Sequence, residues 1–321
     1  DTATAGHLRH VDIQRARGRR RARAWRHARR TLRELGPAHD VILLHDPELL
    51  LALPRSLRER TVWDVHEDTA AAIVAKAWLP RPLQAAGAAA VRRSERWAEE
   101  HLTLVLAEYA YRARLARDHA VVPNTVPVPP RVLPPAMGAV VYLGSITLER
   151  GAREVLAAAR LLRERTDGAV TTHVIGPAHG AAEPLMRSAH ERGDVNWHGF
   201  VPNDRAREML DGALAGLSLL QDLPNYRHSM PTKILEYMAH GVPVITTPLP
   251  LASEAVTEAD AGITVPFEDP VAAAEAVLAL REDADRAAAL GAAGHRAALD
   301  RYDWSHVSDQ FVQILAAVAA R

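Results

Sequence analysis

The chain has 321 residues, about twice the length of a typical domain, so two domains of moderate size are expected. Its 39 basic residues balance 39 acidic ones, which leaves no net field to favour nucleic acid or acidic polymers as partners. The absence of cysteine excludes disulfides, thiolate zinc sites and a cysteine nucleophile. With no apolar run of about 18 residues and no signal peptide, the sequence predicts a cytoplasmic protein without a membrane span.

Arginine is concentrated near the beginning of the chain, with ten arginines in the nineteen positions of 15–33. A cationic helix here would suit a peripheral contact with an anionic membrane surface, or a phosphorylated acceptor. The alternative is a solvated helix face. Nucleic acid is not expected as a partner, because Trp25 is the only aromatic residue in this segment.

Short apolar runs alternate with longer amphipathic ones along most of the chain. This alternation predicts α/β domains in which parallel sheets carry helices on both faces. In chain order, the expected strands are 41–44, 62–65, 102–106, 140–143, 173–175, 217–220 and 244–246, and the expected helices include 151–165, 204–214, 232–240 and 270–281.

A proline-rich segment separates two such domains. Six prolines lie in 123–138, where they are incompatible with a helix interior or a sheet interior. We therefore expect a first domain at 1–130, a second at 131–302 and a terminal helix at 303–321. The first domain offers only about four strands before the linker. Because the chain begins with Asp1, this domain is expected to be either reduced or N-terminally incomplete.

Polar residues and glycines follow several of the expected strands. Ligands of open parallel sheets bind beyond the carboxyl ends of the strands, so these residues are candidates for a site. They are His45, Asp46, His66, Glu67, Gly144, Ser145 and Gly176.

The segment 228–245 carries the densest set of candidate binding residues. Pro231 suits the first turn of a helix, and Gly241 suits its end. The N-terminus of that helix would bind an anion, and Lys233 and Glu236 would share one face of it. A cation beside an anion site and a carboxylate slightly deeper would fit a diphosphate followed by a ribose. A surface Lys–Glu pair is the structural alternative.

Taken together, several segments resemble the retaining family-4 glycosyltransferases, the bacterial group 1 glycosyl transferases. The resemblance extends from about residue 38 to the end of the chain. It implies a GT-B fold, in which two Rossmann-like domains face each other across a cleft and the terminal helix crosses back to the first domain. The segments 140–151, 195–210, 228–245 and 261–277 resemble the donor domain, and 45–50 and 61–68 resemble the acceptor domain of one bacterial branch.

The resemblance implies roles for particular residues toward a nucleotide-diphosphate-sugar. Glu236 matches the glutamate that binds the nucleotide ribose, and His228 occupies the position of a second glutamate near the sugar. Ser145 and Arg150 occupy the positions of two cations that bind the diphosphate. One cation is thus lost, and we hypothesise that Lys233 replaces it.

Main-chain groups and one histidine complete the expected site. In the family, N–H groups between the two glutamates hold sugar hydroxyls, which implies Ser229, Met230 and Thr232; Pro231 has no N–H to offer. His66 matches a histidine beside the reaction centre and is the expected catalytic residue. Gly199 resembles the position that meets the nucleobase, Gly144 and Gly176 complete the donor-binding set, and His45, Asp46 and Glu67 are expected to be structural.

The resemblance further implies hexosyl transfer without a metal or any other cofactor. The sequence Asp283-Ala-Asp285 is interpreted as surface charge. The acceptor could be a natural product, a lipid or a polysaccharide. Three alternatives stay open: a GT-B sugar-nucleotide epimerase, a catalytically silent relative or subunit that binds nucleotide-sugar, and a binding module for anionic surfaces built on 15–33.

Overall fold

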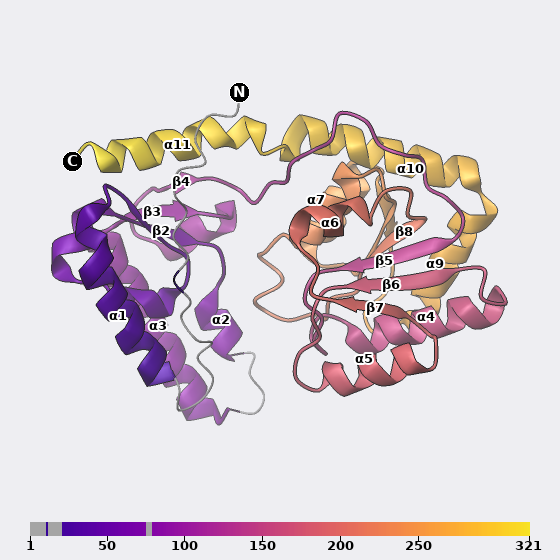
Figure 1. The fold of residues 1–321 in the computed structure, drawn as a ribbon, viewed down its shortest axis with the longest axis horizontal. Helices are drawn as coiled ribbons and strands as arrows, with labels where there is room; N and C mark the ends of the chain where they lie inside the picture. The colour runs from indigo at the N-terminus through magenta and orange to yellow at the C-terminus, as the bar shows by residue number, and fades with distance from the viewer. Residues whose placement is uncertain (1–10, 12–20, 75–78) are drawn as a thin grey trace. The chain divides into compact units, whose positions relative to one another are not determined.

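The computed structural model describes residue 11, residues 21–74 and residues 79–321. Its contacts divide the chain into two compact units. Unit 1 comprises Asp1–Val121 and Phe311–Arg321, and unit 2 comprises Val122–Gln310. The chain therefore passes into unit 2 just before the proline-rich segment and returns to unit 1 within its last helix (Figure 1).

Unit 1 is built on a parallel sheet in the order β1-β2-β3-β4. The inner strand β2 buries Val62, Trp63 and Val65, as expected for a strand covered on both faces. The strands are β1 (Ile42–Leu44), β2 (Thr61–Val65), β3 (Thr103–Leu106) and β4 (Ala120–Val121); the helices are α1 (Arg21–Leu35), α2 (Thr69–Val74) and α3 (Arg81–His101), with 3-10 turns at Gly36–Ala38, Pro47–Leu51, Arg55–Arg60 and Tyr109–Arg114.

The cationic helix predicted for 15–33 lies partly outside the described residues, which omit 15–20. The remainder forms α1, in which Ala28 is buried. The arginines of α1 are exposed except for Arg29, which is half-buried, so the helix presents a strongly cationic face.

Four charged side chains connect α3 to the segments on either side of it in unit 1. The Arg92 guanidinium bonds both carboxylate oxygens of Asp68 at 2.9 and 3.0 Å, and it bonds Glu95 at 2.8 Å. Arg114 lies 3.1 Å from Asp68 and 3.5 Å from Glu95, with its guanidinium carbon 4.2 Å from the centroid of the Tyr111 ring. Burial disfavours the charged form of Asp68, but the hydrogen bond from Ala71 and the two arginines outweigh it and lower the pKa of this carboxyl.

Unit 2 contains a six-stranded parallel sheet in the order β10-β9-β8-β5-β6-β7. Its strands are β5 (Ala139–Leu143), β6 (Thr171–Ile175), β7 (Asn196–Gly199), β8 (Ala215–Ser218), β9 (Val244–Thr246) and β10 (Gly262–Thr264). Its helices are α4 (Ala152–Arg165), α5 (Ala182–Glu191), α6 (Asn203–Glu208), α7 (Thr232–Ala239), α8 (Pro250–Glu258), α9 (Pro270–Glu282) and α10 (Ala284–Ala297), followed by a π-helical turn at Ala298–Tyr302.

Helices cover both faces of this sheet because β5 directs alternate side chains to opposite faces. Val140 and Tyr142 pack with α4, α5 and α9. Val141 and Leu143 pack in a second cluster with α7 and α8. The strand order reverses at β5, between its neighbours β6 and β8. In such sheets, this switch point is where ligands bind.

One helix is shorter than the sequence predicts. The amphipathic pattern predicts a helix over 204–214, but α6 ends at Glu208. The chain continues in tight turns, in which the N–H of Leu210 donates to the carbonyl of Arg207, and then through Gly212 at φ 72°. A positive φ ends a right-handed helix, so the pattern beyond Glu208 reflects buried turn residues.

The two segments that connect the units are bonded to each other within unit 2. The Val126 N–H donates to the carbonyl of Tyr302 at 3.0 Å, and the Trp304 N–H donates to the carbonyl of Val126 at 3.0 Å. Helix α11 (Ser305–Ala319) follows, and its last part belongs to unit 1. Among the described residues, no helix combines the length and the apolar character needed to cross a bilayer.

Candidate functional site

The loops after β5 and β8 meet at the switch point of unit 2. The N–H of Gln221 donates to the carbonyl of Glu149 at 3.1 Å. At Gly151, where φ is 81°, a Cβ would lie 2.0 Å from the carbonyl oxygen of Leu219. Glycine is therefore required for the two loops to approach each other, and this contact fixes the position of the 144–150 loop.

Three glycines expected to bind the donor lie at neighbouring strand ends. Gly144, Gly176 and Gly199 follow or end β5, β6 and β7, all with positive φ. The Gly144 N–H donates to the carbonyl of Ile175, and Gly176 forms an isolated bridge with Gly199. A Cβ on Gly176 would lie 2.2 Å from the Gly144 carbonyl oxygen, whereas one on Gly144 or Gly199 would meet no atom within 4 Å. Gly144 and Gly199 thus leave open space at the edge of the sheet.

Tyr237 holds α7 against this edge. Its hydroxyl accepts from the N–H of Leu143 at 2.9 Å and donates to the carbonyl of Leu217 at 3.1 Å, which links β5, β8 and α7. The Tyr237 ring packs over Gly216, where a Cβ would lie 2.5 Å away. Pro231 lies one position before the helix, as its N-cap, and Gly241 with φ 67° follows its end. The N-terminus of α7 is therefore held near the switch point.

Lys233 is buried in the first turn of α7. Its side-chain nitrogen has no hydrogen-bond partner among the described residues and lies 3.5 Å from the centroid of the Tyr142 ring. The Tyr142 hydroxyl donates to the carbonyl of Ser145 at 3.1 Å, and Arg150 donates to the same carbonyl at 3.4 Å. Burial, and then repulsion from Arg150, lower the pKa of Lys233 well below its ordinary value, although Glu236 opposes the shift.

Glu236 is partly buried one turn further along α7. Burial raises the pKa of its carboxyl, and the nearby cations Arg207 and Lys233 only partly offset this effect. The structure thus brings Ser145, Arg150, Lys233 and Glu236 into one region. His228 and Thr232 are exposed and Ser229 and Met230 half-buried, in or directly after the loop that leads to α7.

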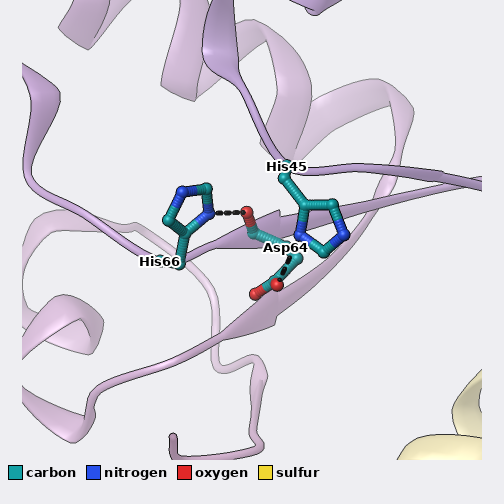
Figure 2. A group of neighbouring side chains, drawn as sticks. All are labelled: His45, Asp64 and His66. Carbon is teal, nitrogen blue, oxygen red and sulfur yellow. Dashed lines mark hydrogen bonds and ion pairs between the residues drawn. The ribbon is translucent and has the colours of Figure 1, made fainter. Parts of the chain in front are cut away.

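Unit 1 brings two histidines to one aspartate, as Figure 2 shows. The parallel register of β1 and β2 pairs Leu44 with Trp63 and so places His45 beside Asp64. His45 Nδ1 donates to Asp64 Oδ2 at 2.9 Å. His66, just beyond the end of β2, donates from Nδ1 to the carbonyl of Asp64 at 3.3 Å, and its Nε2 lies 3.7 Å from Glu67.

The same three side chains have the composition of a metal site. One ligand atom each from His45, Asp64 and His66 lie within 4.8 Å of one another. Two imidazoles and a carboxylate would suit a divalent transition metal.

Asp283 and Asp285, interpreted from the sequence as surface charge, lie at the start of α10. Asp283 accepts from the N–H of Arg286 at 2.9 Å and caps the helix.

Several residues of these sites could not be found from the sequence. Tyr142 and Tyr237 are apolar-pattern residues of a strand and a helix, and Arg207 lies on a helix with other charges. Asp64 interrupts the apolar run of β2. A charged residue inside a buried strand is the one feature of the sequence that could have indicated its place in the site. The sequence prediction named the histidines on either side of it.

Comparison with known proteins identifies the second unit. Residues 138–283 match the family model described as glycosyl transferases group 1. An alpha-maltose-1-phosphate synthase of Mycolicibacterium smegmatis is 27% identical over 193 residues. That alignment covers 56% of this chain and 48% of the synthase, so the chain spans about half the length of this relative.

Solved structures extend the likeness to both units. A sucrose-phosphate synthase from Thermosynechococcus elongatus matches with a TM-score of 0.69 at 15% identity, covering 93% of this chain and 79% of the other. WaaG, a glycosyltransferase involved in lipopolysaccharide biosynthesis, matches with a TM-score of 0.66 at 15% identity, covering 95% and 86%. HepE from Anabaena, in complex with UDP and glucose, matches with a TM-score of 0.66 at 15% identity, covering 95% and 84%.

These findings confirm the α/β fold class predicted from the sequence. The two parallel-sheet units have the architecture of GT-B glycosyltransferases. The family match lies within unit 2 and includes the loop of Gly144, helix α7 and most residues of both core clusters. Residues 138–283 are therefore similar to a group 1 glycosyl transferase domain, in a chain whose two units have the GT-B fold.

Proposed function

We propose that this chain is a glycosyltransferase that moves a sugar from a nucleoside-diphosphate sugar to an acceptor, with retention of the anomeric configuration. The observation that carries the proposal is the Lys233 ammonium, buried without a hydrogen-bond partner among the described residues at the switch point of unit 2. A buried cation is costly unless an anion compensates it. A diphosphate bound there would supply that anion.

The arrangement around Lys233 fits the parts of such a donor. Arg150 and Lys233 place two basic side chains beside the loop of Gly144 and Ser145, and burial followed by repulsion from Arg150 lowers the pKa of Lys233. The first-turn N–H groups of α7 add a partial positive charge. Glu236, one turn deeper, would accept the ribose hydroxyls. Neighbouring GT-B structures that contain UDP or UDP-glucose support a nucleotide-sugar as donor.

In this reaction, the bond between the anomeric carbon and the diphosphate oxygen breaks and a bond from that carbon to the acceptor forms. The nucleoside diphosphate leaves with the bonding electrons, and Arg150, Lys233 and the N-terminus of α7 would stabilise its charge without a metal.

We assign His66 as the catalytic side chain. Its Nδ1 is occupied by the Asp64 carbonyl, so Nε2 is the nitrogen available to a substrate.

A thermal-shift panel tests the donor site. UDP, GDP, TDP, ADP and their common sugar conjugates are compared, each with and without magnesium. A ligand at about 100 times its dissociation constant adds roughly 2.7 kcal/mol to the free energy of unfolding. One nucleotide is expected to raise the melting temperature of the wild type equally in both conditions, and Lys233→Met and Glu236→Gln are expected to abolish the effect.

Two controls make the outcome specific. Arg160→Gln, on the exposed face of α4, removes a cation of unit 2 outside the site and should keep the full shift. His66→Ala should keep the shift given by the nucleotide alone and lose turnover in a transfer assay. A panel in which no nucleotide stabilises the wild type, or in which Lys233→Met responds like the wild type, would refute the proposed donor site.

A further inference from the structure

Unit 1 contains a cavity that the proposed reaction leaves without a role. Its volume is about 780 Å³, and α1, α3 and the two 3-10 turns between β1 and β2 line it. That volume lies within the range of sites for small ligands. The lining residues that the structure describes all belong to unit 1.

The lining of this cavity is strongly cationic. The described residues that line it include five arginines and one acidic residue, Glu100. Among the described residues, no ion pair forms at Arg55, Arg93 or Arg96. By contrast, Arg92, which lies in α3 with Arg93 and Arg96 but outside the cavity, bonds two carboxylates. Unneutralised like charges around one cavity repel each other, and an anion between them would relieve the repulsion.

Arg58 is the most constrained of these arginines. Its guanidinium carbon lies 4.7 Å from the centroid of the Trp97 ring, so the planar group stacks on the indole. Its Nε is buried and has no hydrogen-bond partner among the described residues. Arg29 of α1 is oriented separately, through a bond of 3.3 Å from Nη1 to the Ala52 carbonyl. Two of the five guanidinium groups are therefore held in place before any ligand arrives.

We propose that this cavity is a binding site for a phosphoryl group carried by a small phosphorylated molecule or by a lipid. Several arginines line this one cavity, and planar guanidinium groups suit the bidentate geometry of phosphate oxygens. Leu50, Leu53 and Trp97 supply apolar surface beside them, which suits a ligand with both a phosphate and a carbon skeleton. This site is separate from the donor site of unit 2 and does not depend on the activity assigned to it.

Calorimetric titration with inorganic pyrophosphate and flotation with vesicles test the proposal on the full chain. Vesicles of phosphatidylcholine that carry phosphatidic acid are compared with phosphatidylcholine alone. The pocket variant is Arg93→Gln/Arg96→Gln, because both side chains are exposed and their replacement leaves the core intact. The control is Arg30→Gln/Arg81→Gln, which removes the same charge at exposed positions of α1 and α3 that lie outside the cavity.

The pocket variant is expected to weaken binding about tenfold or more, and the control is expected to bind like the wild type. Arg58→Lys keeps the charge but loses the stacked fork, and it should also weaken binding. Loss of pyrophosphate binding alone assigns a soluble ligand, and loss of vesicle binding assigns a lipid phosphate. Binding that is equal in the pocket variant and the control, or that only Lys233→Met abolishes, would overturn the proposal.

Discussion

Lys233 is a cation that folding removes from water and leaves without a hydrogen-bond partner among the described residues. Its pKa in the folded chain lies below that of an unfolded lysine, so the unfolded state binds more protons between the two values. The free energy of unfolding therefore rises as the pH rises through this interval towards 10.5. Below the interval, Lys233 carries its full cost of burial.

Lys233→Met is accordingly expected to stabilise the free protein by about 1–3 kcal/mol at neutral pH, since it removes a buried unsatisfied group. This gain should shrink as the pH approaches and passes 10.5, where the lysine is neutral in both states. Denaturant titrations of variant and wild type at a series of pH values measure the difference, in which the other titrating groups cancel. A difference that does not change with pH would contradict this account.

Residue spacing could predict part of this site. Lys233 and Glu236 share a helix face because their separation is local, and the glycines at the strand ends follow from the order of the elements. The packing of Lys233 on Tyr142 could not be predicted, because it requires α7 and β5 to lie together through the sheet. Likewise, the bond between His45 and Asp64 depends on the register of two strands.

At the scale of the elements, the glycine that ends β6 controls the approach of two strand ends. A Cβ at Gly176 would lie 2.2 Å from the Gly144 carbonyl oxygen, and φ there is 145°. Gly176→Ala is expected to lower the free energy of unfolding of unit 2 by about 2–4 kcal/mol. Gly168→Ala is the control, with φ 79° and no atom within 4 Å of the added Cβ, and should cost about 1 kcal/mol. Chemical denaturation measures the loss in the free energy of unfolding for both variants. Equal losses would refute the steric explanation.

The ionic cluster at Asp68 joins elements of unit 1 that the sheet does not connect directly. Arg114 contributes a side chain that is 12% exposed to this cluster. Arg114→Met leaves Asp68 and Glu95 with one cation and is expected to destabilise unit 1 by about 3 kcal/mol. Arg112→Met, two residues away in the same turn and in an exposed pair with Asp118, should cost about 1 kcal/mol or less. A similar loss in both variants, measured by urea unfolding, would show that burial of the cluster is not the cause.

The strongly apolar strands could be predicted to within about two residues because their hydrophobic runs are continuous. Three strands are not among the runs named from the sequence, although about four strands were expected before the linker. β4 has two residues, β7 is mostly exposed or half-buried at the sheet edge, and β10 is a three-residue edge strand. Such elements carry little hydrophobic pattern of their own, and the neighbouring strand determines that they form.

At the scale of the whole molecule, composition and alternation were sufficient to predict two α/β units. They could not show that the last residues of the chain complete the first unit. Side chains of α11, among them Val312 and Leu315, line a groove with residues 38–41 of unit 1. The Arg321 guanidinium donates to Thr103 Oγ1 at 3.3 Å. The family resemblance implies this return of the terminal helix, and the long-range packing of these residues assigns 311–321 to the unit formed at the other end of the chain.

This assignment bears on how such a protein can be recombined at the level of its gene. A single crossover in the proline-rich segment would exchange the second unit together with the last helix, which packs on the first. The recipient half would then have to accept a foreign helix against residues 38–41, or lose that covering. Modular exchange of unit 2 therefore requires two crossovers, one near residue 122 and one near residue 310, so that each hydrophobic core keeps its own sequence.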